Sequence, residues 1–117
     1  MNILVYGAGT IGLTYAWLLS NQHQVTVLVR EHKLSTLEQG FTLSIKDLRK
    51  DDQVYKEHHF QPPLVTSIDQ DYDLILLTVN SLQLEQALDH LAAIKEKAHL
   101  LILQNNWNIN SKIPSYL

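Results

Sequence analysis

The chain has 117 residues, of which 45% are hydrophobic and 18% are charged, and its formal net charge at pH 7 is -3. This length fits one domain, and the apolar content is sufficient for a packed core, which argues against wholesale disorder. The slightly acidic balance argues against nucleic acid or an anionic membrane as the main partner, and the lack of cysteine excludes disulfides and thiolate metal sites.

The first predicted elements are a strand and a helix. Residues 3–6 are a short apolar run bounded by glycine, which predicts a strand buried on both faces. An apolar stripe at helical spacing then runs through residues 10–20 and consists of Ile11, Tyr15, Leu18 and Leu19. The N-terminal residues are not typical of a secretory signal, and no stretch approaches the roughly 20 apolar residues of a membrane helix, so we expect a cytoplasmic domain.

The middle of the chain adds a second strand and helix and then changes in character. The β-branched run at residues 25–29 predicts a buried strand, and residues 31–39 predict a helix. Residues 41–45 and 54–60 alternate between apolar and polar side chains, which is typical of an antiparallel hairpin with one solvated face. The sequence QPP at residues 61–63 ends the hairpin, because proline cannot donate to a strand ladder.

Parallel alternation resumes in the last third of the chain. Residues 73–79 predict a strand, residues 84–91 a helix with its leucines in register, and residues 99–103 another strand. Strands that alternate with helices, several of them continuous apolar runs, predict an α/β fold. We therefore expect a mostly parallel sheet with helices on both faces and an antiparallel hairpin insertion around residues 41–60.

Three of the four glycines form the pattern G-x-G-x-x-G between the first strand and the first helix. Gly7 would allow a tight turn, Gly9 a close approach of the backbone to a pyrophosphate, and Gly12 close packing of the helix on the strand. The N–H groups of Thr10 and Ile11 would favour an anion at the start of the helix. The pattern predicts dinucleotide binding; the alternative is a glycine-rich turn that serves packing only.

Arg30 is the first polar residue after the second strand, and it bears on the choice of dinucleotide. Many NAD sites carry an acidic residue there, whereas an arginine can hold the 2′-phosphate of NADP with its planar fork of donors. Glu31 follows directly, and its carboxylate would repel that phosphate. The alternative for Arg30 is a solvated charge at the start of a helix. We favour NADP.

No metal site and no catalytic residue is predicted from the sequence. Glu57, His58 and His59 are the best metal candidates, but neighbouring residues of a strand point to opposite faces, so the two histidines cannot readily bind one ion. No Ser-His-Asp or comparable arrangement indicates a nucleophile.

The ordered motifs resemble the N-terminal domain of the ketopantoate reductases (2-dehydropantoate 2-reductases), the enzymes of pantothenate biosynthesis. The matching stretches run through the whole chain and read ILVYGAGTIG, VTVLVR, HKLSTLEQGFTL, DLILLTVNSLQLEQAL and LLILQNN. The resemblance implies a Rossmann-like NADPH-binding domain, followed in the family by a helical domain whose lysine and glutamate act on a 2-keto acid. Such enzymes are oxidoreductases that reduce this acid to a 2-hydroxy acid.

The resemblance also implies site residues. The segment expected to cradle the pyrophosphate is Gly7, Ala8, Gly9, Thr10, Ile11 and Gly12, and Arg30 would hold the 2′-phosphate. Asn80 stands where the family usually has a lysine and would contact the cofactor. Asn105 would lie close to both nicotinamide and substrate. The family's two glycines in NGxG are Asn106 and Asn108 here, which leaves the substrate open.

We expect residues 1–117 to form a single NADP-binding domain that lacks the family's C-terminal helical catalytic domain and is inactive on its own. Its partners would be a 2-keto acid in the full enzyme and a missing helical domain or a second subunit, with no nucleic acid or membrane. Two other classes stay open. One is a regulatory nucleotide-sensing domain, such as those attached to potassium channels, and the other is a non-catalytic module that kept the fold.

Overall fold

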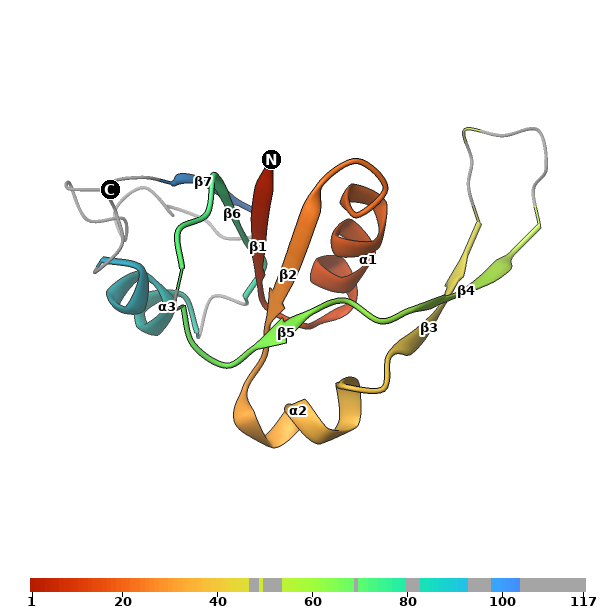
Figure 1. Cartoon of the computed structure of the whole chain (residues 1–117), viewed down its shortest axis with the longest axis horizontal. Helices are drawn as coiled ribbons and strands as arrows, with labels where there is room; N and C mark the ends of the chain where they lie inside the picture. Colours follow the sequence, from red (N-terminus) through yellow and green to blue (C-terminus); the bar gives the residue numbers. More distant parts are fainter. Residues whose placement is uncertain (47–48, 50–53, 69, 80–82, 93–97, 104–117) are drawn as a thin grey trace.

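The computed structural model describes residues 1–46, 49, 54–68, 70–79, 83–92 and 98–103, and Figure 1 shows how their elements are arranged. In chain order the elements are β1 (Asn2–Tyr6), α1 (Thr10–Leu19), β2 (Gln24–Leu28), α2 (Glu31–Leu37), β3 (Phe41–Ile45), β4 (Lys56–Phe60), β5 (Leu64–Val65), β6 (Leu74–Leu77), α3 (Leu84–Leu91) and β7 (His99–Ile102). None of the helices in this described part has the length and apolarity needed to cross a membrane.

Five strands form one parallel sheet in the order β5-β2-β1-β6-β7. β1 lies at its centre, with Ile3 opposite Val25 of β2 on one side and Leu74 of β6 on the other. The chain runs outward from β1 through β2 to β5, and then returns to add β6 and β7 on the opposite side. This reversal creates a switch point beside β1, where the carboxyl ends of neighbouring strands lead into loops that diverge. The predicted parallel sheet is confirmed.

Both faces of the sheet are buried, because β1 contributes alternate side chains to two cores. Ile3 and Val5 belong to the core that contains Ala16 of α1, and α2 packs against the same core through half-buried leucines. Leu4 belongs to the opposite core, which contains Leu84 and Leu88 of α3. Figure 1 shows α1 and α3 on opposite sides of the sheet. Helices on both faces are therefore confirmed.

The hairpin predicted around residues 41–60 is also present, as a separate two-stranded antiparallel sheet of β3 and β4. Phe41 lies opposite Phe60, and their rings meet edge to face at 5.5 Å between centroids. The hairpin extends away from the main sheet (Figure 1). One contact with the body of the domain joins the rings of Trp17 in α1 and His58 in β4, whose centroids are 4.6 Å apart.

The sequence does not predict β5, which consists of Leu64 and Val65 only. This strand is too short to show a period, and it directly follows Pro62 and Pro63. The prolines do not prevent pairing, because Pro63 acts as an acceptor: the N–H of Val27 donates to its carbonyl oxygen at 2.9 Å. An edge strand tolerates proline in this way.

The helix predicted at residues 10–20 is confirmed, but most of its apolar stripe does not face the core. Ile11 is 56% exposed, Tyr15 42% and Leu18 36%, although an apolar stripe of a surface helix usually faces the core. The buried residues of α1 are Gly12 and Ala16. Small side chains let the helix approach the sheet closely, so the large ones are left on its outer side.

Candidate functional site

A cleft of about 550 Å³ opens at the switch point, beside the carboxyl ends of β1, β2 and β6. It is lined by the glycine loop at residues 7–9, by Arg30 and Lys33 after β2, by Thr78 after β6, and by α3 with the residue that precedes it. The glycine loop and Arg30, which the sequence analysis proposes as cofactor-binding, therefore line the same cleft, although Gly12 and Arg30 are 18 positions apart in the chain. Open α/β folds bind ligands at this position, outside the carboxyl ends of the strands at a switch point.

The structure gives a different reason for glycine at each of the three positions of the motif. Gly7 has φ +125°, a left-handed conformation that favours glycine, and a Cβ there would lie 2.6 Å from the Oγ1 of Thr78. A Cβ on Gly12 would overlap the carbonyl oxygen of Gly7, which explains the close packing of α1. Gly9 has ordinary backbone angles, and a Cβ there would meet nothing within 4 Å.

Gly9 therefore bears on the alternative that the glycines serve packing only. Packing accounts for Gly7 and Gly12 but gives no reason for a glycine at position 9, which lines the cleft and faces open space. A bare backbone at such a place lets a ligand come closer than any side chain would allow.

α1 begins directly after this loop, with Gly9 as its N-cap and no side chain bonded to its first turn. The first intrahelical bond runs from the N–H of Leu13 to the carbonyl oxygen of Gly9 at 2.9 Å, so the N–H groups of Thr10, Ile11 and Gly12 have no acceptor within the helix. The first turn holds no acidic residue that would oppose an anion. The loop thus combines free donors with the positive end of a helix dipole.

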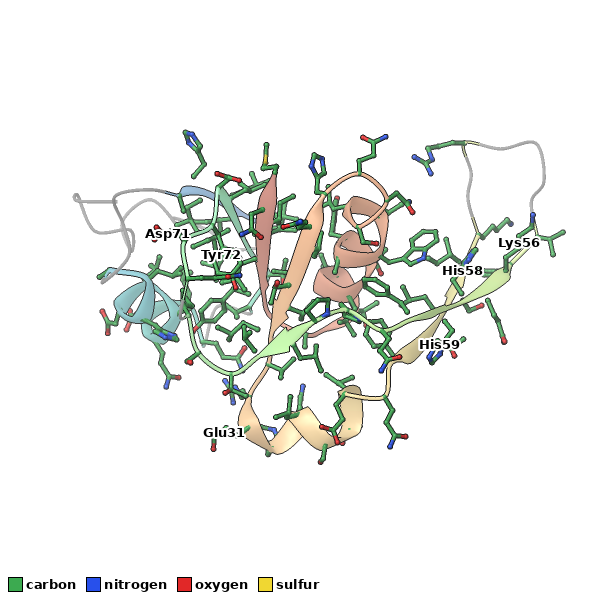
Figure 2. All side chains as sticks on the ribbon, viewed as in Figure 1. Glu31, Lys56, His58, His59, Asp71 and Tyr72 are labelled. Carbon is green, nitrogen blue, oxygen red and sulfur yellow. The ribbon has the colours of Figure 1, made fainter. Side chains whose placement is uncertain are left out.

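Arg30 is exposed at the junction of β2 and α2, where it lines the cleft. Lys33, one turn further along α2, lines the same cleft, although no motif in the sequence marks it. Glu31 is exposed at the beginning of α2 but is not among the described residues that line the cleft (Figure 2). The carboxylate that complicates the interpretation of Arg30 therefore stands beside the cleft and not in its lining.

Thr78 is a second residue of the cleft that no motif in the sequence marks. Its backbone N–H donates to the carbonyl oxygen of Tyr6 at 3.0 Å. Its hydroxyl shares one proton between the carbonyl oxygens of Gly7 at 3.2 Å and Tyr6 at 3.3 Å. The only signal in the sequence is a hydroxyl residue at the end of an apolar strand. Thr78 connects β6 to the glycine loop.

Tyr6 and His90 form a polar pair in the same cleft. The hydroxyl of Tyr6 lies 3.0 Å from Nδ1 of His90, and the two rings meet edge to face with centroids 5.8 Å apart. Burial raises the pKa of Tyr6 above its ordinary value, while the positive charge of Arg30 acts in the opposite direction. Tyr6 therefore stays protonated at neutral pH and serves as a hydrogen-bonding group.

The remaining candidates are two predicted site residues and the two histidines that the sequence argues against as metal ligands. Asn80 and Asn105 lie outside the described residues. His58 and His59 lie on opposite sides of the hairpin (Figure 2), where His58 stacks on Trp17 and His59 pairs with Thr42. Within the described part of the chain, no group of three or more histidine, aspartate or glutamate side chains could hold a metal ion.

The sheet order, the glycine loop at the switch point and the first turn of α1 together define a Rossmann-like domain. A sequence model described as "Ketopantoate reductase PanE/ApbA" matches residues 3–117. The chain therefore belongs to the ketopantoate reductase family, whose members are oxidoreductases, and corresponds to the N-terminal domain of that family.

Individual relatives agree with this family. A 2-dehydropantoate 2-reductase of Bacillus subtilis is 34% identical over 108 residues, which cover 90% of this chain and 33% of the relative. One from Listeria monocytogenes is 29% identical over 107 residues, which cover 90% of this chain and 35% of the relative. The chain thus spans about one third of the length of the curated relatives that it matches.

Solved structures show the same fold. The crystal structure of a probable 2-dehydropantoate 2-reductase from Bacillus subtilis matches with a TM-score of 0.74 at 31% identity, covering 90% of this chain and 34% of that one. A D-mandelate dehydrogenase in a ternary structure with NADH and anilino(oxo)acetate matches with a TM-score of 0.73 at 22% identity, covering 97% and 38%. The second similarity concerns the fold alone.

Proposed function

We propose that residues 1–117 are the NADP(H)-binding domain of a 2-dehydropantoate 2-reductase-like oxidoreductase, which reduces a 2-keto acid to a 2-hydroxy acid. The observation that carries this proposal is that a glycine loop with open space at Gly9 and the cation Arg30 line one cleft at the switch point of the sheet. Bound NADPH would supply the hydride, and the chain's own residues would bind and orient the cofactor.

Each described residue has a role in this proposal. The pyrophosphate would approach the bare backbone at Gly9 and accept hydrogen bonds from the N–H groups of Thr10 and Ile11. The guanidinium of Arg30 would pair with the 2′-phosphate, which its planar fork fits bidentately. The roles of Asn80 at the cofactor and Asn105 near nicotinamide and substrate rest on the family resemblance.

The rest of the enzyme is also part of the proposal. Because the chain spans one third of its relatives' length, a helical domain or a second subunit would complete the cleft over the nicotinamide and supply the acid that protonates the keto oxygen. Reduction of a 2-keto acid with NADPH would take place in the cytoplasm.

Titration of the purified chain with NADPH, NADH and ATP by isothermal calorimetry tests this function. We expect NADPH to bind more tightly than NADH, because only NADPH carries the phosphate that Arg30 would hold. Arg30→Ala should remove most of the preference and leave NADH affinity almost unchanged. A charge-assisted bond is worth about 1.5–3 kcal/mol, so NADPH affinity should fall about tenfold or more. Equal losses for both cofactors would refute the role of Arg30.

Gly9→Val provides the complementary variant. Its side chain would occupy the space for the pyrophosphate, so binding of both dinucleotides should be lost while the thermal unfolding midpoint stays close to that of the wild type. Unchanged binding by a folded variant would contradict the proposal and favour the packing-only interpretation. Tighter binding of ATP than of either dinucleotide would instead favour the nucleotide-sensing class.

A further inference from the structure

The cleft carries a second cation that the proposed function does not use. Lys33 lies one turn after Arg30, and its backbone N–H donates to the carbonyl oxygen of Arg30 at 2.9 Å. Both side chains line the cleft, whereas Glu31 and His32, which separate them in the sequence, are exposed outside its described lining. The start of α2 is thus arranged so that its two cations face the cleft and its carboxylate does not.

We propose that Lys33 is a specificity-determining residue, which together with Arg30 forms a two-cation seat for a phosphate on the 2′ position of the nucleotide's ribose. This inference rests on the proposed function and deepens it. The seat consists of side chains from one corner of the cleft, where β2 ends and α2 begins.

The charge balance at this corner supports two cations. A phosphate monoester carries about −1.5 to −2 charges near neutral pH, so one guanidinium leaves it incompletely neutralised. Glu31 is adjacent to Arg30 in the chain and reduces the positive potential that Arg30 presents to an anion. Lys33 restores that potential on the side of the cleft, where its flexible ammonium can follow the phosphate.

The neighbouring strand adds a polar wall to the same corner. The N–H of Val29 donates to the carbonyl oxygen of Val65 at 2.8 Å, which holds the end of β5 against the end of β2. Thr66 follows directly and lines the cleft together with Arg30 and Lys33. The unpredicted strand β5 therefore closes the corner in which the proposed phosphate would lie.

Two small ligands that differ only in the 2′-phosphate, 2′,5′-ADP and 5′-AMP, isolate the effect of Lys33. We expect Lys33→Ala to weaken binding of 2′,5′-ADP by about three- to tenfold and binding of 5′-AMP by less than about twofold. Lys33→Arg should restore the preference, because it keeps the charge. In the Arg30→Ala/Lys33→Ala double variant the two ligands should bind almost equally. His32→Ala is the matched control, since this neighbour lies outside the described lining, and it should leave both affinities unchanged.

The dependence on salt gives a second measurement that a loss of packing would not reproduce. The preference of the wild type for 2′,5′-ADP should fall as ionic strength rises, and Lys33→Ala should show a shallower fall. A wild type that prefers 2′,5′-ADP, with a Lys33→Ala variant that keeps the full preference, would overturn the inference and leave the proposed function standing. A wild type that binds neither these ligands nor NADPH would overturn the proposed function itself.

Discussion

The hydroxyl of Thr78 lies 3.2 Å from the carbonyl oxygen of Gly7 and 3.3 Å from that of Tyr6, so one side chain at the end of β6 holds the turn that leads into the glycine loop. The same oxygen is the atom that a Cβ on Gly7 would approach to 2.6 Å. The position of the loop therefore depends on β6 as much as on its own glycines.

Thr78→Val tests this dependence, because valine has nearly the shape of threonine but cannot donate. We expect the free energy of unfolding to fall by about 1 kcal/mol, the usual net contribution of a hydrogen bond, and NADPH affinity to fall with it. Thr78→Ser keeps the donor and should retain the affinity. Urea unfolding and calorimetric titration provide the measurements. A valine variant with wild-type stability and affinity would show that the hydroxyl does not position the loop.

Gly12→Ala and Gly9→Ala should separate stability from binding. The added Cβ at position 12 would overlap the carbonyl oxygen of Gly7, so α1 would have to move away from the sheet. We expect the free energy of unfolding to fall by about 1–3 kcal/mol, as for other overpacked positions. The Cβ at position 9 meets nothing within 4 Å, so Gly9→Ala should lower the unfolding midpoint less than Gly12→Ala, because only the preference for glycine at the N-cap is lost, and it should weaken dinucleotide binding. A thermal melt in which Gly9→Ala lowers the unfolding midpoint more than Gly12→Ala does, or a titration in which Gly9→Ala binds dinucleotide as the wild type does, would contradict these assignments.

Tyr72→Phe should stabilise the protein. Tyr72 is only 3% exposed in the core beside α3 (Figure 2), and its hydroxyl has no hydrogen-bond partner within the described structure. An unsatisfied buried polar group costs about 1–3 kcal/mol, and phenylalanine removes that group while keeping the ring. The midpoint of urea unfolding should rise with an unchanged slope. A clear loss of stability would mean that the hydroxyl makes a bond in solution.

The raised pKa of Tyr6 predicts how stability responds to alkaline pH. The unfolded chain releases this proton near the ordinary pKa of 10.0, whereas burial holds it to higher pH in the folded protein. Above pH 10.0, the ordinary pKa of tyrosine, the unfolded state binds fewer protons than the folded state, so the free energy of unfolding should decrease as pH rises. Denaturant unfolding of Tyr6→Phe should show a smaller decrease than that of the wild type. Between about pH 8 and pH 9 the two proteins should follow parallel curves; parallel curves above pH 10 as well would contradict the shift.

Most of the fold could be predicted from periodicity, because apolar runs buried on both faces and helical repeats are local signals. The alternation at residues 41–60 indicated the hairpin for the same reason. β5 could not be predicted, since a strand of two residues after Pro63 has no period and exists only because β2 offers it a partner. The apolar stripe indicates the wrong orientation for α1. Gly12, whose close packing the glycine motif predicts, and Ala16 face the sheet, because small residues allow close approach.

Some residues of the candidate site have a signal in the sequence and others do not. The glycine loop and Arg30 could be identified because a spaced motif and the end of a strand are visible in the sequence. Thr78 and His90 could not, because they reach the cleft only after β6 and α3 have been placed beside β1. Lys33 could not either, because only the course of α2 after Arg30 brings it to the cleft. Their residue types are ordinary ones for helices and strand ends, and only the three-dimensional arrangement distinguishes them.

The central place of β1 has a consequence for the order of events in folding. Gly7 and Thr78 are 71 positions apart in the chain, so the segment between them must be synthesised before β1 can pair with β6. Contacts between such distant segments form slowly, because the entropy of closing a long loop is lost before the pairing compensates for it. β1 and the glycine loop therefore gain their contacts with β6 late in synthesis, and the cleft is complete only when β6 has paired with β1.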